Sequence, residues 1–107
     1  MIGRGEIWLV NLDPLLSNEI CRGRICVVIS PREIHDHLGT VIVAPMRTGA
    51  CPAPFRTGLS HRGKQGLILL DQLRSVDKAR LVDHRGYVSA RTIGEALRTM
   101  QDFFAAD

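Results

Sequence analysis

The chain has 107 residues, of which 45% are hydrophobic and 23% are charged, a composition that excludes a disordered, fibrous or low-complexity protein. We expect a single domain over residues 1–107, because chains divide into separate cores only well above ~200 residues. No apolar run approaches the ~20 residues that a membrane-spanning helix needs. The first residues also lack the pattern of a secretory signal, so the sequence predicts a cytoplasmic protein without membrane contact.

The charge balance is slightly basic. Fourteen Lys and Arg against eleven Asp and Glu give a net charge of +3, and the excess lies in residues 1–64. Such a balance is compatible with a polyanionic partner without establishing one.

No metal site or cofactor is predicted. The three cysteines lack C-x-x-C spacing and are interpreted as reduced thiols. His35-Asp36-His37 comes nearest to a metal-binding pattern, but histidines two residues apart on a helix do not share a face. We interpret this segment as solvated surface.

Turn signals divide the first half of the chain into short strands. Strands are expected at residues 6–12, 25–30 and 41–45, and the second of these is continuously apolar, which is typical of burial on both faces. Residues 15–24 are expected to form a loop. A helical turn or two should follow Ser30 as N-cap and Pro31 as first helical residue.

In the second half, we expect a loop over residues 46–54, a short strand near 55–59 and a polar turn over 60–65. One long strand should then cover residues 66–76, and residues 80–88 should form a last strand or hairpin broken around 83–86. Ser89 is a candidate N-cap for a helix that reaches about residue 105. The elements together predict a mainly β (α+β) fold: a small twisted antiparallel barrel with a short helix and a C-terminal helix.

Polar residues gather in the expected loops and interrupt one apolar strand. If these segments meet at one rim of the barrel, they form a basic groove suited to single-stranded nucleic acid. The alternative is that the charges are scattered and solvated, and no aromatic stacking platform is evident. The residues are Asn18, Glu19, Arg22 and Arg24 in one loop, Arg47 and Thr48 in a second, Arg56, Arg62 and Lys64 around a third, and Asp71, Gln72 and Arg74 in the strand.

Several ordered blocks resemble the MazF/PemK-type toxins. The segment R-G-E-I-W-L-V-N-L-D-P at residues 4–14, followed by Glu19 and Arg24, is similar to the opening of that family. Residues 42–49 resemble its V-x-P-x-T-T/S segment, Pro54-Phe55 its P-F pair, and residues 66–81 its D-Q-x-R-T/S-x-D block. The resemblance covers about residues 4–82.

The resemblance implies the toxin of a type II toxin–antitoxin pair with an SH3-like barrel that forms a homodimer. The implied activity is metal-independent, sequence-selective endoribonucleolytic cleavage of single-stranded RNA, chiefly mRNA, through attack of the RNA 2′-hydroxyl. The implied partners are the RNA and a cognate antitoxin with an acidic tail. Operator DNA would be bound only indirectly, through the antitoxin.

By the same resemblance, Arg24 is the main catalytic residue, as a phosphate clamp or a proton donor, and the clamp fits the high pKa of arginine better. Glu19 is either the base or a residue that positions Arg24. Asn18, Arg22 and Arg56 are expected to contact RNA, as are Asp71 and Gln72, which match the D-Q pair.

The chain departs from the family pattern at two positions that bear on activity. Ile25 follows Arg24 where the family has proline, and Arg47 replaces the first threonine of P-x-T-T, with Thr48 kept beside it. Arg47 either adds charge stabilisation or blocks the scissile phosphate. The alternatives to an active nuclease are therefore a catalytically weakened relative that binds RNA or antitoxin, and a CcdB-like gyrase poison. The second lacks support because the chain has no Trp-Gly-Ile tail.

Overall fold

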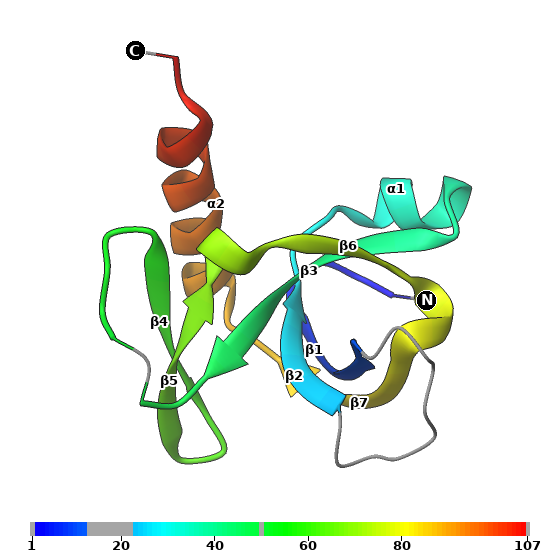
Figure 1. The fold of residues 1–107 in the computed structure, drawn as a ribbon, viewed down its shortest axis with the longest axis horizontal. Coiled ribbons are helices and arrows are strands. Elements are labelled where there is room, and N and C mark those ends of the chain that lie inside the picture. The colour runs from blue at the N-terminus through cyan, green and yellow to red at the C-terminus, as the bar shows by residue number, and fades with distance from the viewer. Residues whose placement is uncertain (1, 13–22, 50, 107) are drawn as a thin grey trace.

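The computed structural model describes residues 2–12, 23–49 and 51–106, and its strands curl into an antiparallel half-barrel flanked by helices (Figure 1). The strand order is β4-β5-β3-β2-β1-β7, and β6 pairs with β3. This confirms the predicted mainly β fold with a C-terminal helix. The elements are β1 (Glu6–Asn11), β2 (Gly23–Val28), α1 (Arg32–His37), β3 (Thr40–Arg47), β4 (Arg56–His61), β5 (Lys64–Leu69), η2 (Leu70–Gln72), β6 (Arg74–Asp77), η3 (Lys78–Arg80), β7 (Leu81–Tyr87) and α2 (Ala90–Phe104).

Strand β2 is buried on both faces, as its apolar run predicted. Because side chains alternate along a strand, Cys26 and Val28 join one core cluster while Val27 and Ile29 join the other. The first cluster lies inside the curl of β1, β2, β3 and β6. The second also takes in Ala96, which joins α2 to the sheet.

The prediction of one long strand over residues 66–76 is wrong, because η2 interrupts it. The strands on either side of η2, β5 and β6, pair with the same strand, β3. Ile68 pairs with Met46, and Arg74 pairs with Val43. Moving six residues along this segment, from 68 to 74, therefore moves the pairing by only three residues along β3. The turn of 3-10 helix takes up the three extra residues.

A tight hairpin joins β4 to β5 where a broad polar turn was expected. His61 pairs with Lys64, and the two residues between them, Arg62 and Gly63, have φ of 52° and 77°. Two successive left-handed residues form the type I′ turn that suits the twist of a hairpin. The ladder therefore extends to the turn, and its polar side chains are held on regular strands.

Strand β7 runs unbroken where a break around residues 83–86 was expected. It pairs with β1 along its length, with register shifts between Ile7 and Trp8 and between Leu9 and Val10. Gly86 has φ of 132°, and a Cβ there would lie 3.2 Å from His61 Cε1. Glycine therefore lets the histidine ring approach the β7 backbone.

Two predictions near α1 are wrong: Ser30 is not the N-cap of this helix, and His35 does not lie on the solvated surface. Pro31 is the N-cap, while Ser30 Oγ accepts the Ile42 N–H at 2.9 Å and bonds His35 Nε2. His35 is only 1% exposed, and its Nδ1 lies 2.9 Å from the Ile2 carbonyl oxygen. A histidine can be buried when both ring nitrogens have partners.

The C-terminal helix follows the prediction closely. Ser89 Oγ accepts the Thr92 N–H at 3.1 Å and caps α2, which packs beside β4 (Figure 1). Among the described residues, no helix combines the length and apolar character needed to cross a membrane.

Candidate functional site

Two arginines mark the end of the β2–β3 ladder. The last paired residues are Cys26 and Pro45; Arg24 lies two residues before Cys26 on β2, and Arg47 lies two residues beyond Pro45 on β3. Because side chains alternate along a strand, Arg24 projects on the same face as Cys26, and Arg47 on the same face as Pro45. Both arginines are exposed, and Arg47 is fixed from its other side by pairing with Leu67 of β5. Arg24 thus belongs to a strand, although the sequence placed it in a loop.

A third arginine, Arg74, acts on the same region. Burial raises the pKa of the Cys26 thiol to about 12, while the charges of Arg24 and Arg74 pull it down. Both guanidinium groups therefore lie near this thiol. Arg24 and Arg74 therefore place positive charge around Cys26, and Arg47 adds a further exposed charge at the end of β3; such a basic region favours binding of an anion. Arg74 was noted in the sequence only as a charge in an apolar strand; its position two residues before the inward-facing Val76 was the available signal.

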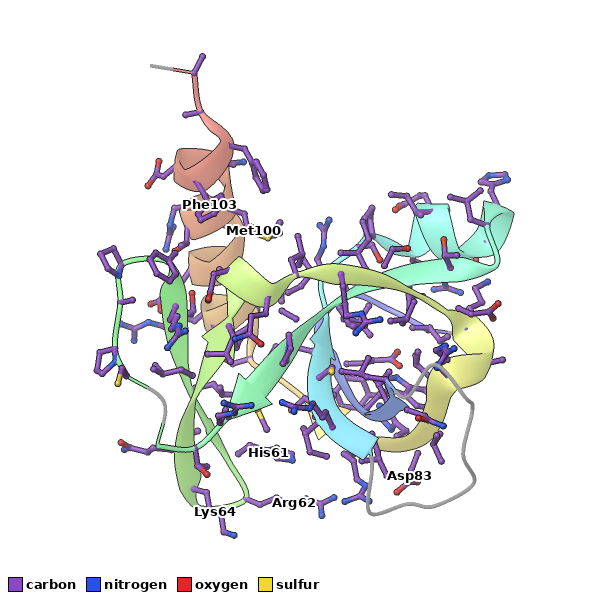
Figure 2. The ribbon with its side chains drawn as sticks, viewed as in Figure 1. His61, Arg62, Lys64, Asp83, Met100 and Phe103 are labelled. Atoms are coloured by element: carbon purple, nitrogen blue, oxygen red, sulfur yellow. The ribbon has the colours of Figure 1, made fainter. Side chains whose placement is uncertain are left out.

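A cavity of about 300 Å³ opens on the other face of these strand ends. Ile25 and Met46, the neighbours of the two arginines, line it, as do the β4–β5 hairpin and β7. Figure 2 shows His61, Arg62 and Lys64 around the turn of this hairpin. The other lining residues are Thr48, Leu59, Gly66 and Arg85.

The cavity combines an apolar interior with a cationic rim. Ile25, Met46 and Leu59 supply apolar surface, and among the residues that the structure describes the charged ones lining the cavity are all basic: Arg62, Lys64 and Arg85. Arg62 Nη2 donates to the Arg85 carbonyl oxygen at 3.2 Å, which ties the hairpin to β7. Arg85 Nε in turn donates to Asp83 Oδ2 at 2.7 Å.

Sequence reasoning did not single out two of the cavity residues, His61 and Arg85. They stand 24 positions apart, in segments expected to be turns. Only the I′ hairpin and the close approach at Gly86 bring them to one cavity. Thr48, which the resemblance kept as the surviving threonine, does line this cavity.

Arg56 and Asp71 pair with each other at the far end of β4. Arg56 Nε and Nη2 donate to the two Asp71 carboxylate oxygens, each at 3.2 Å, and Nη1 donates to the Cys51 carbonyl oxygen at 2.8 Å. These hydrogen bonds hold the pKa of Asp71 below its usual value. Five residues of strand, about 16 Å, separate Arg56 from His61. The pair and the neighbouring Gln72 therefore lie apart from the cavity.

Three further predicted site residues, Asn18, Glu19 and Arg22, lie outside the described residues. Within residues 2–12, 23–49 and 51–106, no group of three or more His, Cys, Asp or Glu side chains is arranged to hold a metal ion.

The family described as "PemK-like, MazF-like toxin of type II toxin-antitoxin system" matches residues 3–104 of the chain. Over 95 residues, 83% of this chain and 79% of the relative, the sequence is 32% identical to Endoribonuclease MazF of Staphylococcus epidermidis.

Solved structures share the fold. MazF (Form-I) from Deinococcus radiodurans superposes with a TM-score of 0.77 at 23% identity, over 95% of this chain and 94% of that chain. An endoribonuclease in complex with its cognate antitoxin, from a Mycobacterial species, gives 0.81 at 14% identity over 100% of both chains. MazE-MazF (Form-II) from Deinococcus radiodurans gives 0.79 at 21% identity, over 99% and 97%. The family match and these likenesses confirm the resemblance read from the sequence: the chain belongs to the PemK-like, MazF-like toxins of type II toxin–antitoxin systems.

Proposed function

We propose that this protein is an endoribonuclease that cleaves single-stranded RNA, chiefly mRNA, at selected sequences and without a metal ion. The observation that carries the proposal is the presence of two exposed arginines, Arg24 and Arg47, just beyond the β2–β3 ladder and next to a cavity lined by Thr48. A relative that is 32% identical is named Endoribonuclease MazF, which supports the same activity here.

RNA supplies its own nucleophile, so the protein needs only to move protons and stabilise charge. A base removes the 2′-hydroxyl proton, the oxygen attacks the adjacent phosphorus, and the bond to the 5′ oxygen breaks as that oxygen takes up a proton. The products are a 2′,3′-cyclic phosphate and a 5′-hydroxyl. Arg24 and Arg47 bind the phosphoryl oxygens on which negative charge grows.

Roles for the remaining predicted residues follow the family resemblance. Glu19 acts as the base or holds Arg24 in place, and Asn18 and Arg22 contact the RNA from the same segment. Arg56, Asp71 and Gln72 extend the contact surface, where any RNA contact must compete with the Arg56–Asp71 ion pair. The single domain spans residues 1–107.

An active nuclease is favoured over the weakened, binding-only alternative. Arg47 is exposed and pairs through its backbone with Leu67, so the guanidinium can reach a phosphate from a fixed strand. An arginine fork matches phosphate geometry. The charge of Arg47 thus takes the place of the threonine hydroxyl as a stabilising contact.

A cognate antitoxin with an acidic tail is the proposed inhibitor, since a basic cluster attracts carboxylates as well as phosphates. Related toxins have been solved as MazE-MazF complexes. We further propose a cytoplasmic homodimer that reaches operator DNA only through the antitoxin.

Cleavage of a long RNA of mixed sequence tests the proposal. The purified protein is incubated with the RNA in the presence of a chelator, and the new ends are mapped. We expect a small set of sites with 2′,3′-cyclic phosphate and 5′-hydroxyl ends. Cleavage that stops with chelator, or no cleavage at all, would overturn the proposal.

A further inference from the structure

We propose that the cavity behind Arg24 and Arg47 is a nucleobase pocket, which receives one base next to the scissile phosphate and so contributes to the choice of cleavage site. This inference rests on the proposed endoribonuclease function. It assigns to the β4–β5 hairpin a role in RNA selection.

The size and chemistry of the cavity fit a single nucleotide. Its volume of about 300 Å³ lies at the small end of ligand pockets. Ile25, Met46 and Leu59 offer apolar contact to the face of a base, and Arg62, Lys64 and Arg85 surround it with positive charge. A flat, weakly polar ring attached to an anionic backbone matches both features.

The position of the cavity next to Arg24 and Arg47 determines which nucleotide enters it. In antiparallel strands, Ile25 and Met46 project on the face opposite to Arg24 and Arg47, yet each is adjacent in sequence to one of them. A phosphate bound by Arg24 or Arg47 therefore lies next to a residue that lines the cavity, and Thr48, which follows Arg47, lines it as well. The base beside that phosphate then faces the cavity.

His61 is the group best suited to read the edge of the base. It lines the cavity from the last position of β4, and its ring is placed by the close approach to Gly86. An imidazole can donate or accept a hydrogen bond, and it can also stack on a base. Lys64, its partner across the hairpin, makes no ion pair within the described residues and supplies a charge for the backbone of that nucleotide.

An abasic scan tests the pocket. The cleavage site is first mapped, and an RNA oligonucleotide spanning it is made uncleavable by a 2′-deoxy substitution at the scissile nucleotide. Each position is then replaced in turn by an abasic nucleotide, and binding is measured by fluorescence anisotropy. We expect one position beside the scissile phosphate to lower wild-type affinity about 10-fold, as loss of a stacked base does.

The same scan on a variant carrying His61→Ala and Lys64→Gln identifies where that base binds. The abasic effect should fall below about twofold in the variant, because the base and the pocket act as one coupled pair. A matched control carrying His37→Ala and Arg91→Gln, both exposed residues on the helices, should keep the full effect. An equal abasic effect in the variant and wild type, or no sensitive position, would overturn the pocket.

A cross-linking readout does not depend on the variant folding. Wild-type protein is irradiated with the oligonucleotide carrying a photoreactive base at the sensitive position, and the cross-linked peptide is sequenced. Attachment within β4–β5 or at Ile25, Met46, Thr48 or Arg85, which all line the cavity, supports the pocket, and attachment elsewhere refutes it. If the wild-type protein cleaves RNA but fails these tests, only the pocket fails; if it neither binds nor cleaves RNA, the proposed function fails with it.

Discussion

Arg24 and Arg47 each lie two residues outside the last paired residues of β2 and β3, Cys26 and Pro45. Both side chains are exposed and positively charged, so each can bind an anion at this end of the sheet. The side chains next to them, Ile25 and Met46, turn to the opposite face and enter the cavity. One end of a two-strand ladder therefore presents charge on one side and apolar surface on the other.

Replacing Arg24 with Ala should abolish most of the cleavage activity. Removal of one donor that stabilises transition-state charge costs roughly 10²–10³-fold in rate. Arg24→Lys should recover part of the loss, because lysine keeps the charge but lacks the planar fork. Single-turnover cleavage of a fixed oligonucleotide measures both. Arg91→Ala, on the exposed face of α2, is the matched control, and a wild-type rate for Arg24→Ala would remove the proposed mechanism.

Arg47 should contribute to catalysis despite replacing the family's threonine. We expect Arg47→Ala to slow cleavage by about 10-fold, and the slope of log affinity against log salt for RNA to decrease by about 0.7, the value for one lost phosphate contact to a single strand. Arg47→Thr should not raise the rate. Faster cleavage by Arg47→Thr than by wild type would mean instead that the arginine blocks the scissile phosphate.

Local patterns were sufficient to predict much of the fold. The apolar run at residues 25–30 and the Ser89 cap both describe interactions within a few residues, and both were confirmed. The η2 interruption was missed because it depends on the register of two segments against β3, which no local pattern records. His35 was misplaced for a similar reason, since its partner Ile2 is 33 residues away.

The candidate site was only partly predictable. Arg24, Arg47 and Thr48 were predicted from the family resemblance. The resemblance did not show that the arginines project on one face of the sheet while Thr48 lines the cavity on the other, because this depends on the strands that the structure forms. His61 and Arg85 required a turn with left-handed Arg62, a residue that does not suggest a type I′ turn. The Arg56–Asp71 pair joins residues 15 apart and was not foreseen.

The Arg56–Asp71 ion pair should make stability depend on acid pH. The hydrogen bonds from Arg56 lower the pKa of Asp71 in the folded chain, so the pair stabilises the fold above the unfolded pKa of about 3.9. The contribution is lost as the pH falls through the folded value. Asp71→Asn should therefore lower the melting temperature slightly at pH 7 and not at all in strong acid. Asp36→Asn, on exposed α1, is the control; a deficit that persists unchanged in acid would exclude the charge as its cause.

Cys26 and Cys51 should differ in reactivity. Burial raises the pKa of Cys26 to about 12, so only about 10⁻⁴ of it is thiolate at pH 8, whereas Cys51 is exposed. Alkylation followed by peptide mapping should label Cys51 in the native protein and Cys26 only after unfolding. Equal labelling of the two under native conditions would contradict the burial.

The raised pKa of Cys26 also predicts how the stability of the fold changes at alkaline pH. Between the unfolded pKa of about 8.5 and the folded value of about 12, the unfolded chain loses a proton that the native chain keeps. Stability from Cys26 is thus complete below this range and lost as the pH rises through it. Cys26→Ala should flatten the decline in unfolding free energy above pH 9, measured by urea denaturation; an unchanged slope would contradict the assignment.

The buried Ser30–His35 pair should stabilise the fold without taking part in RNA cleavage. The Ile2 carbonyl only accepts, so His35 Nδ1–H donates to it, and Ser30 Oγ accepts the Ile42 N–H and donates to Nε2. Ser30→Ala leaves two buried groups without partners, which costs about 1–3 kcal/mol.

His35→Ala should cost more, about 2–5 kcal/mol, because it adds a cavity to the lost hydrogen bonds. Urea denaturation measures both variants, and His37→Ala, two residues along on the exposed side of α1, should change stability by less than about 0.5 kcal/mol. The cleavage rate per folded molecule should stay at the wild-type level for all three. A Ser30→Ala variant as stable as wild type would mean that the hydroxyl does not satisfy the Ile42 N–H and His35 in solution.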